Sequence, residues 1–297
     1  MPMPARQLVQ IVSGLLRCSP QVARQQILEG LVEVNQKQTL DTRRTLQPGD
    51  RVEVHRGEPR RAEQQPLVDR LAIRIVHEDS ELLVVEKPAG LLTVPTPHRE
   101  KHTLLALLAR KLQHERQAAR SPELFSVHRL DRDVSGLLLV ARTLETAEQL
   151  REQFAERKPH RRYEAFVAGQ LQPHKGTIRS FLATDDQLNR HSVPTAEQGE
   201  LAITHYEVLR ELSDSTHVSV TLETGRRNQI RVHLSEQGHP VLGETRYRRD
   251  LAAHPAWPWK RLALHACELG FRHPHSGREL HFHSRLPPEF KQFLKTI

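Results

Sequence analysis

The chain has 297 residues, with 44 Lys and Arg against 36 Asp and Glu, which gives a formal net charge of +8. No apolar run approaches the roughly 18 residues that a membrane helix needs, and the opening residues MPMPARQ lack the pattern of a secretory signal. Only two cysteines are present, Cys18 and Cys267, which excludes a disulfide framework. We therefore expect a soluble, cytoplasmic protein whose positive charge favours a polyanionic partner.

Residues 1–60 are predicted to form a small binding unit. Apolar residues at helical spacing predict a helix over residues 5–16. A second helix is expected between Ser19, which can cap it, and Gly30, which can end it. Two short strands complete the unit, at residues 31–34 and 51–54. Two helices and a hairpin are too small for an enzyme but large enough for a binding module.

A polar stretch with two prolines separates this unit from the rest, and we place the linker at residues 61–71. Residues 72–297 then form the second domain, with helices expected at 103–117 and 144–157. Strands are expected at 73–77, 82–85, 137–141, 163–168, 203–209, 216–222, 229–234 and 263–271. Because strands and helices do not alternate regularly, we predict an α+β domain with a mixed, largely antiparallel sheet.

The densest chemical signal is residues 128–136, with the sequence HRLDRDVSG, which run directly into an apolar strand. A run of charges is most often a solvated turn. Here Asp131 lies between two arginines at the mouth of a buried strand, where a neighbouring guanidinium would keep a carboxylate ionised. This position favours a catalytic role for Asp131.

Two further motifs carry charged or aromatic side chains. Residues 224–234 (TGRRNQIRVHL) are interpreted as a strand with Arg227, Arg231 and His233 on one face. A basic surface strand that contacts only water explains this spacing equally well. Tyr163 lies in another expected strand, where a tyrosine usually packs in a core. Its part in a site stays open on the spacing alone.

Metal and nucleotide sites are not expected. Although 19 histidines are present, the chain lacks a thiolate pair and a His-Glu-x-x-His motif, and it has no glycine-rich phosphate loop. Four of the histidines lie close together near the C-terminus: His273, His275, His281 and His283.

Taken together, these motifs resemble those of the RluA-type pseudouridine synthases. The resemblance extends over some 220 residues and includes the segments 78–90, 128–136, 161–163, 224–234, 238–243 and 264–274. The N-terminal unit is similar to the α-L RNA-binding module. The resemblance implies the pseudouridine synthase fold and an isomerase that converts uridine in RNA to pseudouridine without a cofactor.

The resemblance also implies roles for residues. Asp131 would be the essential carboxylate, and the choice between attack on C1′ and removal of a C2′ proton stays open. Tyr163 would pack against the target base, Arg231 would pair with Asp131, and Arg129 would fill the stack left by the flipped nucleotide. Other substrate-binding positions would be His128, Lys87, Arg226, Asn228 and Gln229.

The sequence departs from the family pattern at two positions. Val134 stands where the family usually has Thr, and Asn228 where it usually has His. An alternative is therefore a non-catalytic RNA-binding or chaperone protein on a synthase scaffold, and a metal-dependent nuclease is a more remote hypothesis. We expect a monomer that binds RNA, with ribosomal RNA favoured, transfer RNA open, and no membrane partner.

Overall fold

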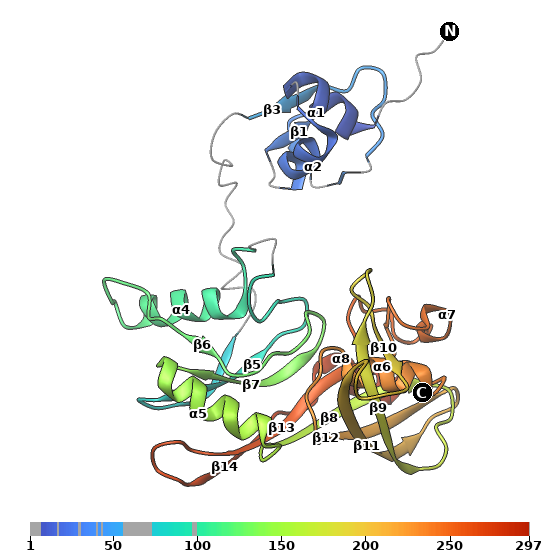
Figure 1. Ribbon diagram of the computed structural model, residues 1–297. Helices are drawn as coiled ribbons and strands as arrows, with labels where there is room; N and C mark the ends of the chain where they lie inside the picture. The colour runs from blue at the N-terminus through green and yellow to red at the C-terminus, as the bar shows by residue number, and fades with distance from the viewer. Residues whose placement is uncertain are drawn as a thin grey trace. The chain divides into compact units, whose positions relative to one another are not determined.

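A computed structural model gives the structure of the chain, which divides into two units, residues 1–69 and 70–297 (Figure 1). The structure describes residues 7–16, 18–28, 31–39, 41–42, 44–55, 73–96 and 100–296. The predicted linker at 61–71 and Gly30 lie outside these residues. None of the described helices is long and apolar enough to cross a membrane.

The N-terminal unit consists of two helices and a three-stranded sheet in the order β2-β1-β3. Its elements are α1 (Leu8–Leu16), α2 (Pro20–Leu28), β1 (Val32–Val34), β2 (Lys37–Gln38) and β3 (Val52–Val54). Apolar side chains from both helices and from β1 form its core, among them Leu8, Ile27 and Val32. The two helices and the two strands that the sequence predicted are confirmed, and β2 is an additional short strand that the sequence analysis did not predict.

The second unit contains a single mixed sheet. Its described strands are β4 (Arg74–Glu78), β5 (Leu82–Lys87), β6 (Phe125–Ser126), β7 (Ser135–Ala141), β8 (His160–Ala168), β9 (Lys175–Thr184), β10 (Arg190–Val193), β11 (Glu200–Glu211), β12 (Ser215–Leu222), β13 (Leu264–Arg272) and β14 (Glu279–His283). The strand order is β10-β9-β11-β12-β8-β13-β7-β5-β4, with β14 beside β13 and β6 beside β7. The β7–β13 pair is parallel and the other described pairs are antiparallel, so the predicted α+β class is confirmed.

Helices pack at both ends of this sheet (Figure 1). They are α4 (Leu104–Glu115), α5 (Leu144–Ala155), α6 (Gln229–Glu236), α7 (Arg249–Ala252) and α8 (Pro288–Thr296). Helix α5 contacts β6 and β7, and α6 contacts β10 and β11. The apolar side chains of β5, β7 and α5 form one core. The helices predicted at 103–117 and 144–157 are therefore confirmed as α4 and α5.

The strand predicted at 229–234 is wrong, because these residues form helix α6. The helix is buried on several sides, including Ile230, Val232 and Leu234, and this burial produced an apolar alternation that resembles a strand. Arg227, Arg231 and His233 therefore do not share a strand face. Instead Asn228 and Arg231 are three residues apart at the start of a helix, where side chains lie on one face.

The contact between β7 and β13 brings the two halves of the sheet together. Gly136 in β7 pairs with Ala266 in β13, and Ala266 also pairs with Tyr163 in β8. Gly136 has a φ of 120°, and an added Cβ would overlap the backbone of Ala266. Glycine at this position therefore permits the approach that carries the loop before β7 toward Tyr163.

We expect Gly136→Ala to lower the free energy of unfolding by about 3 kcal/mol or more, from backbone strain and overpacking together. Gly238→Ala is the matched control, because Gly238 also has a positive φ, of 85°, but an added Cβ would meet no atom within 4 Å. The control should cost about 1 kcal/mol. Denaturant unfolding of both variants checks this expectation, and equal losses would contradict the proposed close approach.

Candidate active site

Asp131 lies on a loop that enters β7, and buried polar side chains hold this loop. The Lys87 ammonium donates to the carbonyls of Pro88 (2.9 Å), Leu91 (2.7 Å) and Arg132 (3.0 Å). Burial lowers the pKa of Lys87 to about 7, although the charges of the nearby aspartates oppose the shift. The loop that carries Asp131 is thereby bound to the turn that follows β5.

A cavity of about 60 Å³ lies beside this loop, and most of the predicted site residues line it. The polar lining residues are Arg129, Asp131, Tyr163, Arg226, Asn228, Gln229 and Arg231, and the apolar ones are Leu130, Val134, Leu222, Ile230 and Leu264. Burial raises the pKa of Tyr163, so its phenol stays protonated at neutral pH. The fold thus joins three separate motifs of the sequence at one cavity.

Arg231 connects two carboxylates at this cavity. Its Nη1 lies 3.1 Å from Oδ2 of Asp131, while its Nε and Nη2 lie 2.6 and 2.7 Å from the two carboxylate oxygens of Glu244. Burial opposes the charge of both partners, but the pairing outweighs it, which raises the pKa of Arg231 and lowers that of Glu244. The bidentate bond to Glu244 orients the guanidinium so that Nη1 faces Asp131.

Asn228 completes the environment of Asp131. It has a left-handed backbone, with a φ of 56°, which asparagine tolerates better than most residues. With its amide nitrogen toward Asp131, Asn228 donates to Oδ2 at 2.9 Å and Oδ1 at 3.1 Å, and its oxygen accepts from the Tyr247 hydroxyl at 3.0 Å. The opposite orientation would place an amide oxygen against a carboxylate. Asn228 therefore supplies hydrogen bonds to Asp131 at the position where the family usually has His.

Three predicted substrate-binding residues use their polar atoms inside the protein. His128 Nε2 accepts from the Leu139 N–H at 3.1 Å, and burial lowers the pKa of His128 to about 3, so the ring stays neutral. The Gln229 amide bonds to Thr224, Ile203, Thr204 and the Arg226 N–H. Lys87 has the three carbonyl bonds described above and does not line the cavity of Asp131. These residues hold the walls of the site in place.

Sequence reasoning missed Glu244 and Tyr247. A lone carboxylate near Arg246, Arg248 and Arg249 was the one available signal. This signal did not indicate Arg231 as the partner of Glu244. Arg231 lies 13 residues earlier, in a segment that the sequence analysis interpreted as a strand and that is helix α6. Glu244 also accepts the backbone N–H groups of Thr245 and Arg246 at 2.9 and 2.8 Å, so its side chain is fixed before it contacts Arg231.

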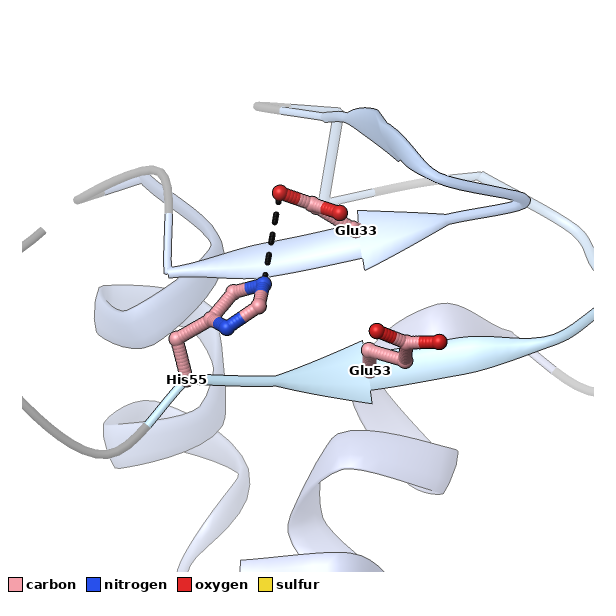
Figure 2. A group of neighbouring side chains, drawn as sticks. All are labelled: Glu33, Glu53 and His55. Carbon is pink, nitrogen blue, oxygen red and sulfur yellow. Dashed lines mark ion pairs between the residues drawn. The ribbon is translucent and has the colours of Figure 1, made fainter. Parts of the chain in front are cut away.

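One group of possible metal ligands occurs among the described residues, and it lies in the N-terminal unit. Glu33, Glu53 and His55 lie on one face of its sheet (Figure 2). His55 Nε2 lies 3.3 Å from Glu33, and Arg51 lies 3.1 Å from Glu53, so each carboxylate already has a basic neighbour. These ion pairs account for the position of the three side chains, so no metal ion is needed to explain the group. The C-terminal histidines do not form such a group within the part of the chain that is described.

Comparison with known proteins identifies the class. Residues 81–236 match the model of the RNA pseudouridylate synthase family, and the chain belongs to this family. It is accordingly an isomerase, an RNA pseudouridine synthase, as the sequence motifs predicted.

Relatives and one solved structure are similar over most of the chain. Ribosomal large subunit pseudouridine synthase D of Zymomonas mobilis is 38% identical, with 80% of this chain and 76% of the relative covered. An uncharacterised RNA pseudouridine synthase of Bacillus subtilis is 33% identical, with coverage of 92% and 88%. The structure of human RNA pseudouridylate synthase domain containing 4 is 25% identical, with a TM-score of 0.62 and coverage of 77% and 94%.

We expect Glu244→Gln to lower the free energy of unfolding by about 3 kcal/mol, because it removes one charge from a buried ion pair. Glu207→Gln is the matched control, since Glu207 forms an exposed pair with Lys175 at 3.6 Å. Its loss should cost less than about 1 kcal/mol. Urea unfolding distinguishes the two, and a small effect at Glu244 would show that Arg231 does not depend on it.

Proposed function

We propose that the enzyme converts uridine to pseudouridine in large-subunit ribosomal RNA, with Asp131 as the catalytic carboxylate. The observation that supports this assignment is the position of Asp131, which lies in one cavity with Tyr163 and bonds to Arg231 at 3.1 Å. The names of relatives such as the Zymomonas mobilis enzyme support the choice of RNA. The enzyme is proposed to act as a monomer.

The proposed reaction begins with a flipped uridine, because C1′ is inaccessible in a stacked helix and flipping costs a few kcal/mol. The N1–C1′ bond breaks, the base rotates, a C5–C1′ bond forms, and the C5 proton leaves while N1 gains one. Asp131 either attacks C1′ or removes a C2′ proton. The reaction is redox-neutral and needs no cofactor.

The neighbours of Asp131 receive roles that fit their chemistry. Arg231 holds the carboxylate and keeps its own charge in a site shielded from water. The buried Tyr163 packs against the target base. Because its phenol is protonated, its hydroxyl assists loss of the C5 proton as a relay that passes a proton on to solvent, and not as a phenolate base. Val134 adds a buried apolar wall, and Asn228 donates to the carboxylate. Neither departure from the family pattern changes Asp131, Tyr163 or Arg231.

Arg129 is proposed to enter the stack that the flipped nucleotide leaves. Its side chain is exposed at the rim of the cavity, and no hydrogen bond or ion pair joins its guanidinium to the described residues. An arginine can stack on neighbouring bases through its planar group. A guanidinium that none of the described residues holds can do so.

The N-terminal unit is proposed to bind the RNA backbone as an α-L type module. Its described surface carries the basic side chains of Arg24, Lys37 and Arg51, all exposed. Arginine and lysine bind phosphates without reading sequence, and such binding weakens steeply as salt rises. This unit would add affinity while the catalytic unit selects the uridine.

We expect Asp131→Asn to reduce turnover by about 1,000-fold or more, because asparagine can neither attack C1′ nor accept a proton. Asp133→Asn removes the same charge from the same loop and should retain most of the activity, since Asp133 does not line the cavity. Tritium release from RNA labelled at C5 of uridine measures both. Retained activity in the Asp131 variant would refute the role of this carboxylate.

In cells, we expect a strain without this gene to lack pseudouridine at a few positions of large-subunit ribosomal RNA. Mapping of pseudouridine in ribosomal and transfer RNA from wild-type and deletion strains makes the comparison. Re-expression of the wild type should restore the positions, whereas the Asp131→Asn variant should not. Loss confined to transfer RNA would reject the proposed substrate, and no loss in any RNA would favour a non-catalytic role.

A further inference from the structure

A second, larger cavity adjoins the one that contains Asp131. It has a volume of about 630 Å³ and shares Arg129, Tyr163, Leu222 and Arg226 with the first. This volume lies within the range of roughly 300–1,000 Å³ that is usual for ligand pockets, so a nucleotide unit fits. Five arginines line it, and no carboxylate does among the described residues: Arg129, Arg151, Arg157, Arg161 and Arg226.

Arg161 differs from the other arginines because it is buried, with 6% of its surface exposed. No carboxylate of the described residues forms an ion pair with it, and its buried Nε has no hydrogen-bond partner. Its contacts are a 3.4 Å bond from Nη2 to the Glu223 carbonyl and the ring of Phe154, 5.2 Å away. Burial without an anion lowers the pKa of Arg161.

The surrounding structure holds this guanidinium at the cavity wall. Arg161 lies in β8 and pairs with Leu269 of β13, while Phe154 reaches it from the end of α5. A side chain at Gly225 would overlap Arg161 Nη1. Glycine in the Thr-Gly-Arg segment therefore leaves room for the arginine, and the fold keeps a cation in a position that is unfavourable without a counter-charge.

Two of the other cavity arginines have a carboxylate partner, and a third is held by a backbone carbonyl. Arg157 pairs with Glu223 at 2.7 Å, and Arg226 pairs with Glu200 at 2.9 Å. Arg151 donates to the Ser126 carbonyl at 3.1 and 2.6 Å. Arg129 also lacks a partner among the described residues, but its side chain is exposed to water. Arg161 is therefore the buried arginine of this cavity that has no anion among the described residues.

We propose that this cavity is a subsite for the nucleotide next to the target uridine, with its phosphodiester group bound to Arg161. The inference rests on the proposed function, since the nucleotide belongs to the RNA strand whose uridine reaches Asp131. A phosphodiester oxygen supplies the anion that Arg161 lacks, and a guanidinium binds phosphate through two parallel bonds. The neighbouring sugar and base then occupy the rest of the cavity beside Phe154.

The test uses full-length Arg161→Met and an unmodified, in vitro transcribed large-subunit ribosomal RNA, with affinity measured from 50 to 200 mM KCl. Loss of one phosphate contact should weaken binding about tenfold at 100 mM and reduce the slope of log K against log salt by about 1. The melting temperature should stay equal or rise, because an apolar side chain replaces a buried cation without a partner. A purely structural arginine would instead lose stability.

Two further variants make the result specific. Arg161→Lys keeps the charge and should retain the salt slope of the wild type. Arg210→Met removes an exposed arginine at the opposite end of the β11–β12 pair from Leu222, which lines the cavity. This variant should leave the slope of log K against log salt unchanged. An equal change of slope at Arg210 would overturn the subsite, as would a lower melting temperature with an unchanged slope at Arg161.

A free nucleotide is the other source of the same phosphate chemistry. Uridine monophosphate should compete for Arg161 only weakly at millimolar concentration. Tight binding of it, lost in Arg161→Met while RNA binding is unaffected, would overturn the assignment to the RNA strand. The salt dependence of RNA binding is measured without turnover, so it tests the subsite whether or not Asp131→Asn abolishes catalysis. Failure of the subsite proposal and failure of the proposed function can therefore be told apart.

Discussion

The candidate active site depends on the ion pairs that join Asp131, Arg231 and Glu244. Asp131 precedes β7, Arg231 lies in α6, and Glu244 follows that helix, so one guanidinium binds segments that are up to 113 residues apart in the sequence. A buried arginine is costly unless it is paired. Two carboxylates surround this one cation, so a net negative charge remains, and because Glu244 is the more buried partner, Asp131 is the one that faces the cavity.

The sheet places these charges beside an aromatic side chain, as the proposed action on a base requires. The parallel contact of β7 and β13 at Gly136 brings the loop of Asp131 close to β8, which carries Tyr163. Lys87 also holds this loop, because it donates to the Arg132 carbonyl as well as to those of Pro88 and Leu91. The ion pairs and the strand contact thus hold Asp131 and Tyr163 in fixed positions, which is the condition for electrostatic preorganisation in the proposed reaction.

Secondary structure was predicted correctly where the spacing of apolar residues along the chain matches the side of the element that is buried. The strand that follows Asp131 and the helices α4 and α5 were predicted because each has a clear period and a clear boundary. The prediction failed at α6, whose burial on several sides hides the helical period. The same error placed Arg231 and His233 on one strand face. His128 and Gln229 lie in segments that resemble the family motifs and were expected to bind substrate. Their polar atoms instead form hydrogen bonds with neighbouring backbone and side chains.

The sequence alone determined the α+β class, the pseudouridine synthase family and the set of motifs from which Asp131, Tyr163 and Arg231 come. These conclusions depend on residue types in a fixed order, which the chain displays directly. Only the tertiary structure decided that Glu244 orients Arg231, that Asn228 turns its amide toward Asp131, and that Arg161 is buried with no anion among the described residues. Pairing and burial depend on which distant segments pack together, and the spacing of residues along the chain does not contain that information.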